Sequence, residues 1–199
     1  MELSELCNRL ESLDPWQLTL FTTALAERQY PNYQLFTEVT DWGDADQARR
    51  QLDKLWERLA NRTGSLNVET QLEKLETITP DPDDFDFYGV QPALDFCVCL
   101  HAAFAQQEEP SFEEAGGVAQ VSMACVDTFL ELTAEPELSD EELVRYINTH
   151  ELMVQEEALQ QQLLEQLLAG TSGDAALVDQ LRQLAANDGV SNIGISIDD

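Results

Sequence analysis

Metal binding is the first chemistry to consider, because the sequence is rich in carboxylates but has only two histidines. His150 begins the segment HELMV, which lacks the second histidine of the H-E-x-x-H zinc motif. A di-iron carboxylate bundle needs Glu-x-x-His twice, but Val98 and Ile147 stand three residues before His101 and His150. These patterns exclude a zincin and a di-iron carboxylate protein.

Four aspartates lie within six residues in 81-DPDDFD-86, directly ahead of an apolar segment. A calcium loop of the EF-hand type needs a central glycine and a closing glutamate, and this run has neither. Aspartates ahead of a helix accept hydrogen bonds from its free N–H groups and favour its dipole, each effect contributing about 0.5 to 1 kcal/mol. We therefore expect a solvated helix entrance in which one or two aspartates act as caps.

Magnesium held by helix carboxylates is the metal chemistry that the patterns leave open. Glu69, Glu73 and Glu76 share one face of a predicted helix, and Asp127 and Glu131 share a face of another. Such spacing is also common on solvated helices. A magnesium-assisted hydrolase is therefore an alternative function, whereas the leading expectation is a protein without metal or cofactor.

Nucleophilic chemistry has one candidate pair, Cys97 and His101, which lie four residues apart on a predicted helix. Both belong to a stripe with helical spacing, and we expect this stripe to be buried, where a cysteine is inert. The stripe consists of Val90, Leu94, Cys97, His101 and Phe104. No catalytic residue is assigned, and the sequence favours a protein that is not an enzyme.

Asp95 lies among apolar neighbours on the same predicted helix. A buried carboxylate needs partners, because burying an unpaired charge costs several kcal/mol or more. We expect Arg28, Arg49, Arg50 or backbone N–H groups to supply them, since arginine forms strong paired hydrogen bonds with carboxylates. A position facing a ligand is the alternative.

The charge distribution limits the partners that this chain can have. Its 10 Lys and Arg residues against 39 Asp and Glu residues give a net charge of −29. Residues 76–199 contain only two basic side chains, Arg145 and Arg182. Direct binding to nucleic acid or to an anionic membrane is disfavoured by electrostatics. We expect a solvated acidic surface, with a nucleic-acid mimic that occupies a basic partner as a further alternative.

The sequence predicts a cytoplasmic protein. Its first residues, MELSELCNRLESL, lack the basic and apolar regions of a secretory signal, and no apolar segment reaches the length of a membrane span. The four cysteines lie in apolar, helix-like patterns, which favours reduced core thiols over a disulfide framework. They are Cys7, Cys97, Cys99 and Cys125.

Helix signals recur along the whole chain and predict an all-α fold of eight or nine helices in a single domain, residues 1–199. Capping patterns begin at Asp14, Ser111 and Ser139, and Pro31 predicts a turn after the first of these helices. Strand-like alternation occurs only near the C-terminus, so residues 188–199 are expected to be an extended tail. Further helices are predicted in 44–62, from Asn67, from Val90, and in 149–170 and 174–187.

Several short segments together resemble the YjaG-like family of uncharacterised bacterial proteins, in the same order along nearly the whole chain. These are AERQYPNYQLF, QLEKLE, DDFDFYGVQPALDFCV, LSDEEL and SNIGI. The resemblance implies an all-helical, single-domain cytoplasmic protein, and it implies no established activity, catalytic residue or cofactor.

The stretches that carry the resemblance are predicted turns and helix entrances, whose side chains either lock the ends of the bundle or line a pocket. The leading functional hypothesis is a non-enzymatic protein that binds a protein partner or a small ligand, and the sequence leaves its oligomeric state open. Candidate binding residues are Tyr30, Asn32, Tyr33, Asp86, Tyr88, Asp95 and Asn192.

Overall fold

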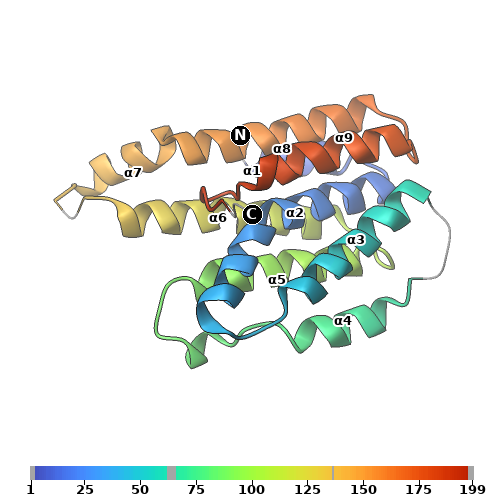
Figure 1. Ribbon diagram of the computed structural model, residues 1–199. Coiled ribbons are helices and arrows are strands. Elements are labelled where there is room, and N and C mark those ends of the chain that lie inside the picture. Colours follow the sequence, from blue (N-terminus) through green and yellow to red (C-terminus); the bar gives the residue numbers. More distant parts are fainter. Residues whose placement is uncertain (1–2, 62–65, 136, 197–199) are drawn as a thin grey trace.

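The computed structural model describes residues 3–61, 66–135 and 137–196, and within these ranges the fold is all α (Figure 1). Nine α-helices and two short 3₁₀ helices form there, which confirms the predicted fold class. The α-helices are α1 (Leu3–Leu10), α2 (Pro15–Thr40), α3 (Ala45–Asn61), α4 (Val68–Glu76), α5 (Val90–Ala105), α6 (Phe112–Thr133), α7 (Asp140–Thr149), α8 (Glu151–Ala169) and α9 (Ala175–Ala186), and the 3₁₀ helices are η1 (Pro82–Asp84) and η2 (Asn187–Gly189).

Local capping chemistry sets where most helices begin. Both halves of the capping box are present at Asp14 with Gln17 and at Ser139 with Glu142. In each, the first side chain accepts a hydrogen bond from the third helical N–H, and the later side chain accepts one from the cap backbone. The side chain of Asn67 caps α4 in the same way, by accepting a hydrogen bond from the backbone N–H of Thr70.

Helix α2 runs through Pro31, so the predicted turn at this proline is wrong. A proline inside a helix removes one backbone hydrogen bond and costs roughly 3 kcal/mol. Here the cost is offset by burial, because α2 is buried over nearly all of its length before Pro31, and Asn32, Tyr33 and Phe36 are buried after it. Tertiary packing therefore outweighs the tendency of the proline to end the helix.

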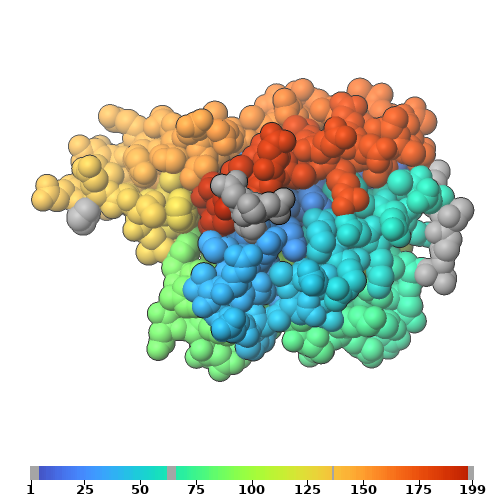
Figure 2. Space-filling model, in the orientation of Figure 1, coloured from blue at the N-terminus to red at the C-terminus, as the bar shows by residue number. Residues whose placement is uncertain are grey.

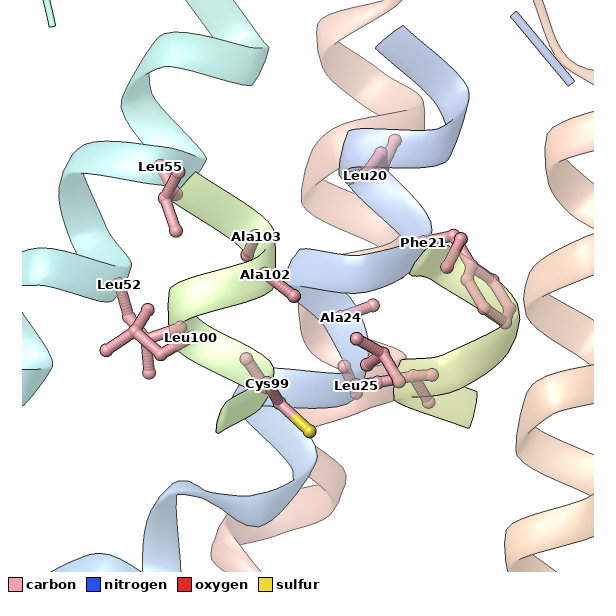
Figure 3. Close-up of a cluster of buried hydrophobic side chains, with 14 of the residues drawn as sticks. Leu20, Phe21, Ala24, Leu25, Leu52, Leu55, Cys99, Leu100, Ala102 and Ala103 are labelled. Atoms are coloured by element: carbon pink, nitrogen blue, oxygen red, sulfur yellow. The ribbon is translucent and has the colours of Figure 1, made fainter. Parts of the chain in front are cut away.

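The main core lies where α2 crosses α5, with α3 on one side (Figure 3). Ala24 of α2 and Ala102 and Ala103 of α5 are small, which allows close approach of the two helices. Leucine and aromatic side chains such as Phe21 fill the space around them. A second apolar cluster forms at the end of the molecule where α6, α7 and α8 project beyond the rest (Figure 2).

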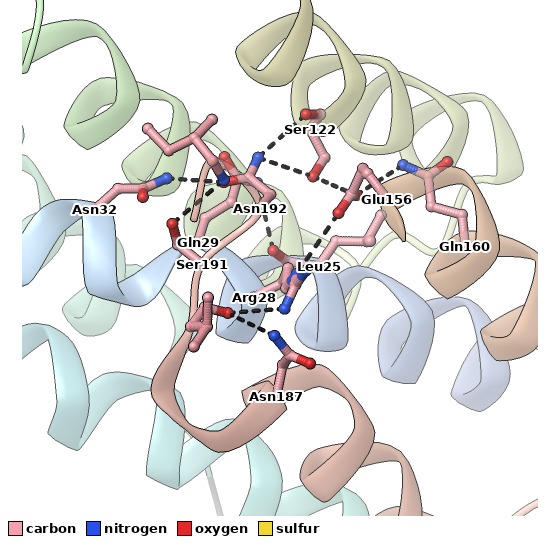
Figure 4. Close-up of polar contacts among 12 residues, drawn as sticks. Leu25, Arg28, Gln29, Asn32, Ser122, Glu156, Gln160, Asn187, Ser191 and Asn192 are labelled. Atoms are coloured by element: carbon pink, nitrogen blue, oxygen red, sulfur yellow. Dashed lines mark hydrogen bonds and ion pairs between the residues drawn. The ribbon is translucent and has the colours of Figure 1, made fainter. Parts of the chain in front are cut away.

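Several polar side chains are buried between α2, α6 and α8 (Figure 4). Glu156 of α8 is 0% exposed and lies 3.7 Å from the Nε atom of Arg28 on α2. The Ser122 hydroxyl of α6 and the Gln160 amide both donate to Oε1 of Glu156, at 2.7 and 3.1 Å. These contacts join three helices through one buried carboxylate.

The C-terminal residues complete this polar network. Residues 190–196 of the predicted extended tail form a tight turn, and residues 197–199 lie outside the described residues. Val190 pairs with Ser196, and the Ser191 hydroxyl accepts hydrogen bonds from the N–H groups of Ile193 and Ile195. Asn192 is 0% exposed. Its amide oxygen accepts from Asn32 at 2.9 Å, and its amide nitrogen donates to the Ser122 carbonyl at 3.2 Å. Ser191, Asn192 and Ile193 are therefore part of the core.

The aspartate run is exposed, as predicted, but it does not cap the helix that follows. Asp81 caps η1 by accepting a hydrogen bond from the N–H of Asp83 at 3.0 Å. Helix α5 begins after Gly89, which provides no side-chain cap. The intervening aromatic residues separate the acidic run from α5, so the predicted capping of that helix is wrong.

Asp95 is half-buried, and the predicted arginine or backbone partners are also wrong. Its carboxylate accepts a hydrogen bond from the Gln91 amide at 2.9 Å. The arginines proposed for it pair elsewhere: Arg28 with Glu156, Arg49 with Glu27 and Asp53, and Arg50 with Asp44. Burial raises the pKa of Asp95, and the Gln91 hydrogen bond opposes that rise.

No helix in the described ranges is long and apolar enough to cross a membrane. The four cysteines are free thiols, and Cys97, Cys99 and Cys125 are buried, as expected for core cysteines. The single-domain organisation of residues 1–199 stays a prediction.

Replacing Asn192 by alanine is expected to destabilise the fold by about 3 kcal/mol, because Asn32 and the Ser122 carbonyl lose a buried partner. Urea unfolding measures the change. Asn148→Ala is the matched control, because Asn148 is exposed on α7, and it should shift the unfolding free energy by less than about 0.5 kcal/mol. Equal effects of the two substitutions would contradict the buried role of Asn192.

Asp95→Asn is expected to raise the urea midpoint at pH 7. A raised pKa means that the folded state binds the proton more tightly than the unfolded chain, so stability is lost as the pH rises above the ordinary value near 4. The gain from asparagine should therefore vanish towards pH 3. Asp86→Asn, at an exposed site, is the matched control and should change the free energy of unfolding by less than about 0.5 kcal/mol. A loss of stability at pH 7 on Asp95→Asn would refute this account.

Candidate functional site

A groove of about 650 Å³ lies between α4 and α5. It is shaped by two helices that differ in role, since α5 is part of the core and α4 lies at the edge of the molecule (Figure 1). Its volume is within the range of roughly 300 to 1,000 Å³ that is usual for ligand sites. The lining residues are Val68, Glu69, Leu72, Glu73, Leu75, Glu76, Thr79, Cys97, Val98, His101 and Glu108.

Side chains of two kinds line this groove. Its floor is apolar and includes the buried residues Val68 and Leu75 of α4. Three exposed carboxylates of α4, those of Glu69, Glu73 and Glu76, form one wall. None of the described residues that line the groove is a lysine or an arginine. The groove is therefore apolar at its base and negative at its rim.

Hydrogen bonds from α3 hold α4 in the position that forms the groove. The side chain of Gln51 donates to the Gln71 carbonyl at 2.7 Å, and that of Gln47 donates to the Lys74 carbonyl at 2.8 Å. Both bonds reach the backbone of α4 from the α3 side. They leave the acidic face of α4 turned towards the groove.

Cys97 and His101 both line the groove, but they differ in burial. Cys97 is buried in the floor, and burial raises the pKa of its thiol to about 12. His101 is exposed, so the prediction that it belongs to the buried stripe is wrong. Phe104, the next member of the stripe, is buried again, so His101 is exposed because the groove opens beside α5 at that position. A thiol with so high a pKa has almost no thiolate at neutral pH, so the pair lacks an activated nucleophile.

The groove carboxylates do not form a metal cluster. Across the described parts of the chain, no group of three or more His, Cys, Asp or Glu side chains converges to hold a metal ion. Glu69, Glu73 and Glu76 instead form a row along one helix. A row of this kind attracts positive charge without enclosing a single cation.

The structure brings together only some of the predicted binding residues. Asn32 and Asn192 bond to each other inside the core. Tyr33 is buried and donates to the Ile78 carbonyl at 2.7 Å, so packing and this hydrogen bond account for its position. Asp86 is exposed, and neither it nor Asp95 contributes to the groove.

Tyr30 belongs to a separate cluster of charged and aromatic side chains between α2 and α3. Its hydroxyl donates to the Ala45 carbonyl at 3.2 Å, and the Arg49 guanidinium lies 5.0 Å above its ring. Burial raises the pKa of Tyr30 to about 12. Glu27 accepts two hydrogen bonds from Arg49, at 2.6 and 2.7 Å, and one from the Trp56 indole at 2.6 Å. The cluster fastens α3 to α2.

Tyr88 and Asn32 line a second, smaller pocket of about 120 Å³. Its other walls are apolar and include Phe36, Phe87 and Ile193. The Tyr88 hydroxyl donates to the Cys125 carbonyl at 3.4 Å. Two predicted residues thus meet at a pocket, but its size falls below that of a usual ligand site.

Sequence reasoning identified the acidic row of α4 but missed the groove that it borders. The signal in the sequence was the combination of that row with Leu72 and Leu75 on the same short helix. The opposite wall was hidden, because His101 has the spacing of the predicted apolar stripe and Val98 lies next to it in a largely apolar segment. Only the packing of α4 against α5 reveals the two walls together.

Comparison with known proteins gives relatives along nearly the whole chain. The chain is 39% identical over 189 residues to the uncharacterized protein YjaG of Escherichia coli, covering 94% of each. An uncharacterized protein of Haemophilus influenzae is 34% identical over 192 residues, with the same coverage. A crystal structure of a DUF416 family protein from Shewanella baltica matches with a TM-score of 0.87 at 37% identity, covering 96% of this chain and 98% of that one.

These likenesses confirm the resemblance drawn from the short segments of the sequence. The family model described as "Protein of unknown function (DUF416)" matches residues 5–196. With relatives of this identity over almost the full length, the chain belongs to the DUF416 family.

Proposed function

We propose that the protein is a non-enzymatic cytoplasmic binding protein whose groove between α4 and α5 takes a ligand with an apolar side and a positive charge. The observation that supports this most directly is the juxtaposition of an apolar floor with the carboxylates of Glu69, Glu73 and Glu76. The apolar floor contributes affinity by burying apolar surface of the ligand, and the acidic wall favours a ligand with a positive charge.

Val98 adds specific support, because it is an apolar residue of α5 that lies 43% exposed within the groove. Covering the exposed side chain of this valine removes apolar surface from water, which stabilises the complex with the ligand. The free, mostly buried thiols favour a reducing compartment, in agreement with a cytoplasmic protein.

Binding is a better account of the groove than either catalytic alternative. A magnesium-assisted hydrolase needs carboxylates that converge on one ion, whereas Glu69, Glu73 and Glu76 are arranged in a row. A thiol nucleophile needs a low pKa, whereas burial raises the pKa of Cys97.

Titration with octylammonium, below the concentration at which it forms micelles, tests the proposal by NMR. We expect saturable shift changes in the backbone amides of α4 and α5, because the alkyl chain covers the floor and the ammonium group meets the acidic wall. Val98→Gln should weaken binding about tenfold, as expected for the loss of one buried valine contact.

Two controls separate groove binding from general attraction to an acidic protein. Val154→Gln changes the same residue type at a position on α8 that is 50% exposed, and it should leave the affinity unchanged. Octanol, which lacks the charge, should bind much more weakly. Shift changes spread evenly over the surface, or equal binding by octanol, would refute the proposal.

A further inference from the structure

We propose that the natural occupant of the α4–α5 groove is an amphipathic helix of a partner protein, with leucine-like residues on one face and lysine or arginine along its edge. This inference rests on the proposed function, and it names the class of ligand. It follows from the openness of the groove, the spacing of its carboxylates and the charge of the whole chain.

The groove is open along its rim. Six of its lining residues are exposed to solvent, and they come from both walls. A small-molecule site usually buries 70 to 90% of its ligand, whereas exposed residues on both walls leave this groove open to solvent. A helix in a groove buries only its apolar face and leaves its other face in water. The exposed lining residues are Glu69, Glu73, Glu76, Val98, His101 and Glu108.

The carboxylate spacing matches that of a second helix. Glu69, Glu73 and Glu76 follow each other by four and three residues, so they lie on one face of α4 over about 10 Å. A helix that packs alongside at roughly 8 to 10 Å presents its own residues at the same intervals. Cations at such intervals can face all three carboxylates in turn.

Charge decides which helix fits. A second copy of this chain would bring its own net charge of −29 to an acidic rim, and repulsion would oppose the contact. A basic helix is attracted by the rim and by the rest of the chain, which raises its association rate. The apolar floor then favours a basic helix with an apolar face over an extended basic segment.

The direct test uses a synthetic peptide of about 14 residues, roughly four helical turns, with leucine on one face and lysine on the other. Calorimetry at physiological salt should give one-to-one binding. A scrambled peptide of the same composition, without an apolar face, should bind at least about tenfold more weakly, a difference of about 1.4 kcal/mol.

A pair of triple variants locates the site. Glu69→Gln with Glu73→Gln and Glu76→Gln removes three charges from the groove and should weaken peptide binding at least about tenfold. The matched control removes three charges from exposed positions outside the groove and should change affinity less than about twofold. All substituted residues are exposed, so folding should persist, and circular dichroism checks this. The control substitutions are Asp127→Asn, Glu131→Gln and Glu135→Gln.

Each result has a distinct meaning. Equal weakening by the two triple variants would mean that the peptide is attracted by the overall charge of the protein. Equal binding of the scrambled peptide would mean that no helix is recognised. Either result would overturn the inference. Failure of the peptide together with groove binding of octylammonium would overturn the helical partner but leave the proposed function standing. Failure of both probes would overturn both.

Discussion

The buried pair of Arg28 and Glu156 is the constraint on which the arrangement of the helices depends. Both side chains are almost fully removed from water, at 4% and 0% exposure. Burial lowers the pKa of Arg28, while Glu156 opposes that shift. Removing one member of such a pair typically costs 3 to 5 kcal/mol, because the other charge stays buried. Helices α2 and α8 are therefore tied to each other at this point.

The pair also explains the long central helix and the buried C-terminal turn. Arg28 donates to the Val190 carbonyl at 2.7 Å. The C-terminal turn thus supplies the buried guanidinium with a hydrogen-bond acceptor in place of water. One residue earlier, Glu27 accepts hydrogen bonds from α3 on the other side of α2. Two adjacent residues thus fix neighbours in two directions. These anchors stand just before Pro31, and Asn32, Tyr33 and Phe36 are buried after it, so α2 is packed against its neighbours on both sides of the proline.

The parts of the fold that the sequence predicts correctly are those set by neighbouring residues. Caps such as Asp14 with Gln17 act over three residues, and the helical spacing of apolar side chains acts over one or two turns. The errors at Pro31 and in the arginine partners expected for Asp95 have another origin, because the burial of α2 and the pairing of Arg28 depend on residues distant in the sequence. The partner of Arg28 stands 128 positions away, so no local pattern shows that this arginine is occupied.

The candidate site shows the same division between local and distant information. The acidic row of α4 is evident in the sequence, but a solvated helix and the wall of a binding groove have the same pattern of charges. What distinguishes them is the apolar surface opposite, which includes the exposed Val98 of α5. Helix α4 is held in place through its backbone by Gln47 and Gln51. Since these bonds come from the α3 side, the groove does not have to close for α4 to be stable, and its apolar floor is left for another surface to cover.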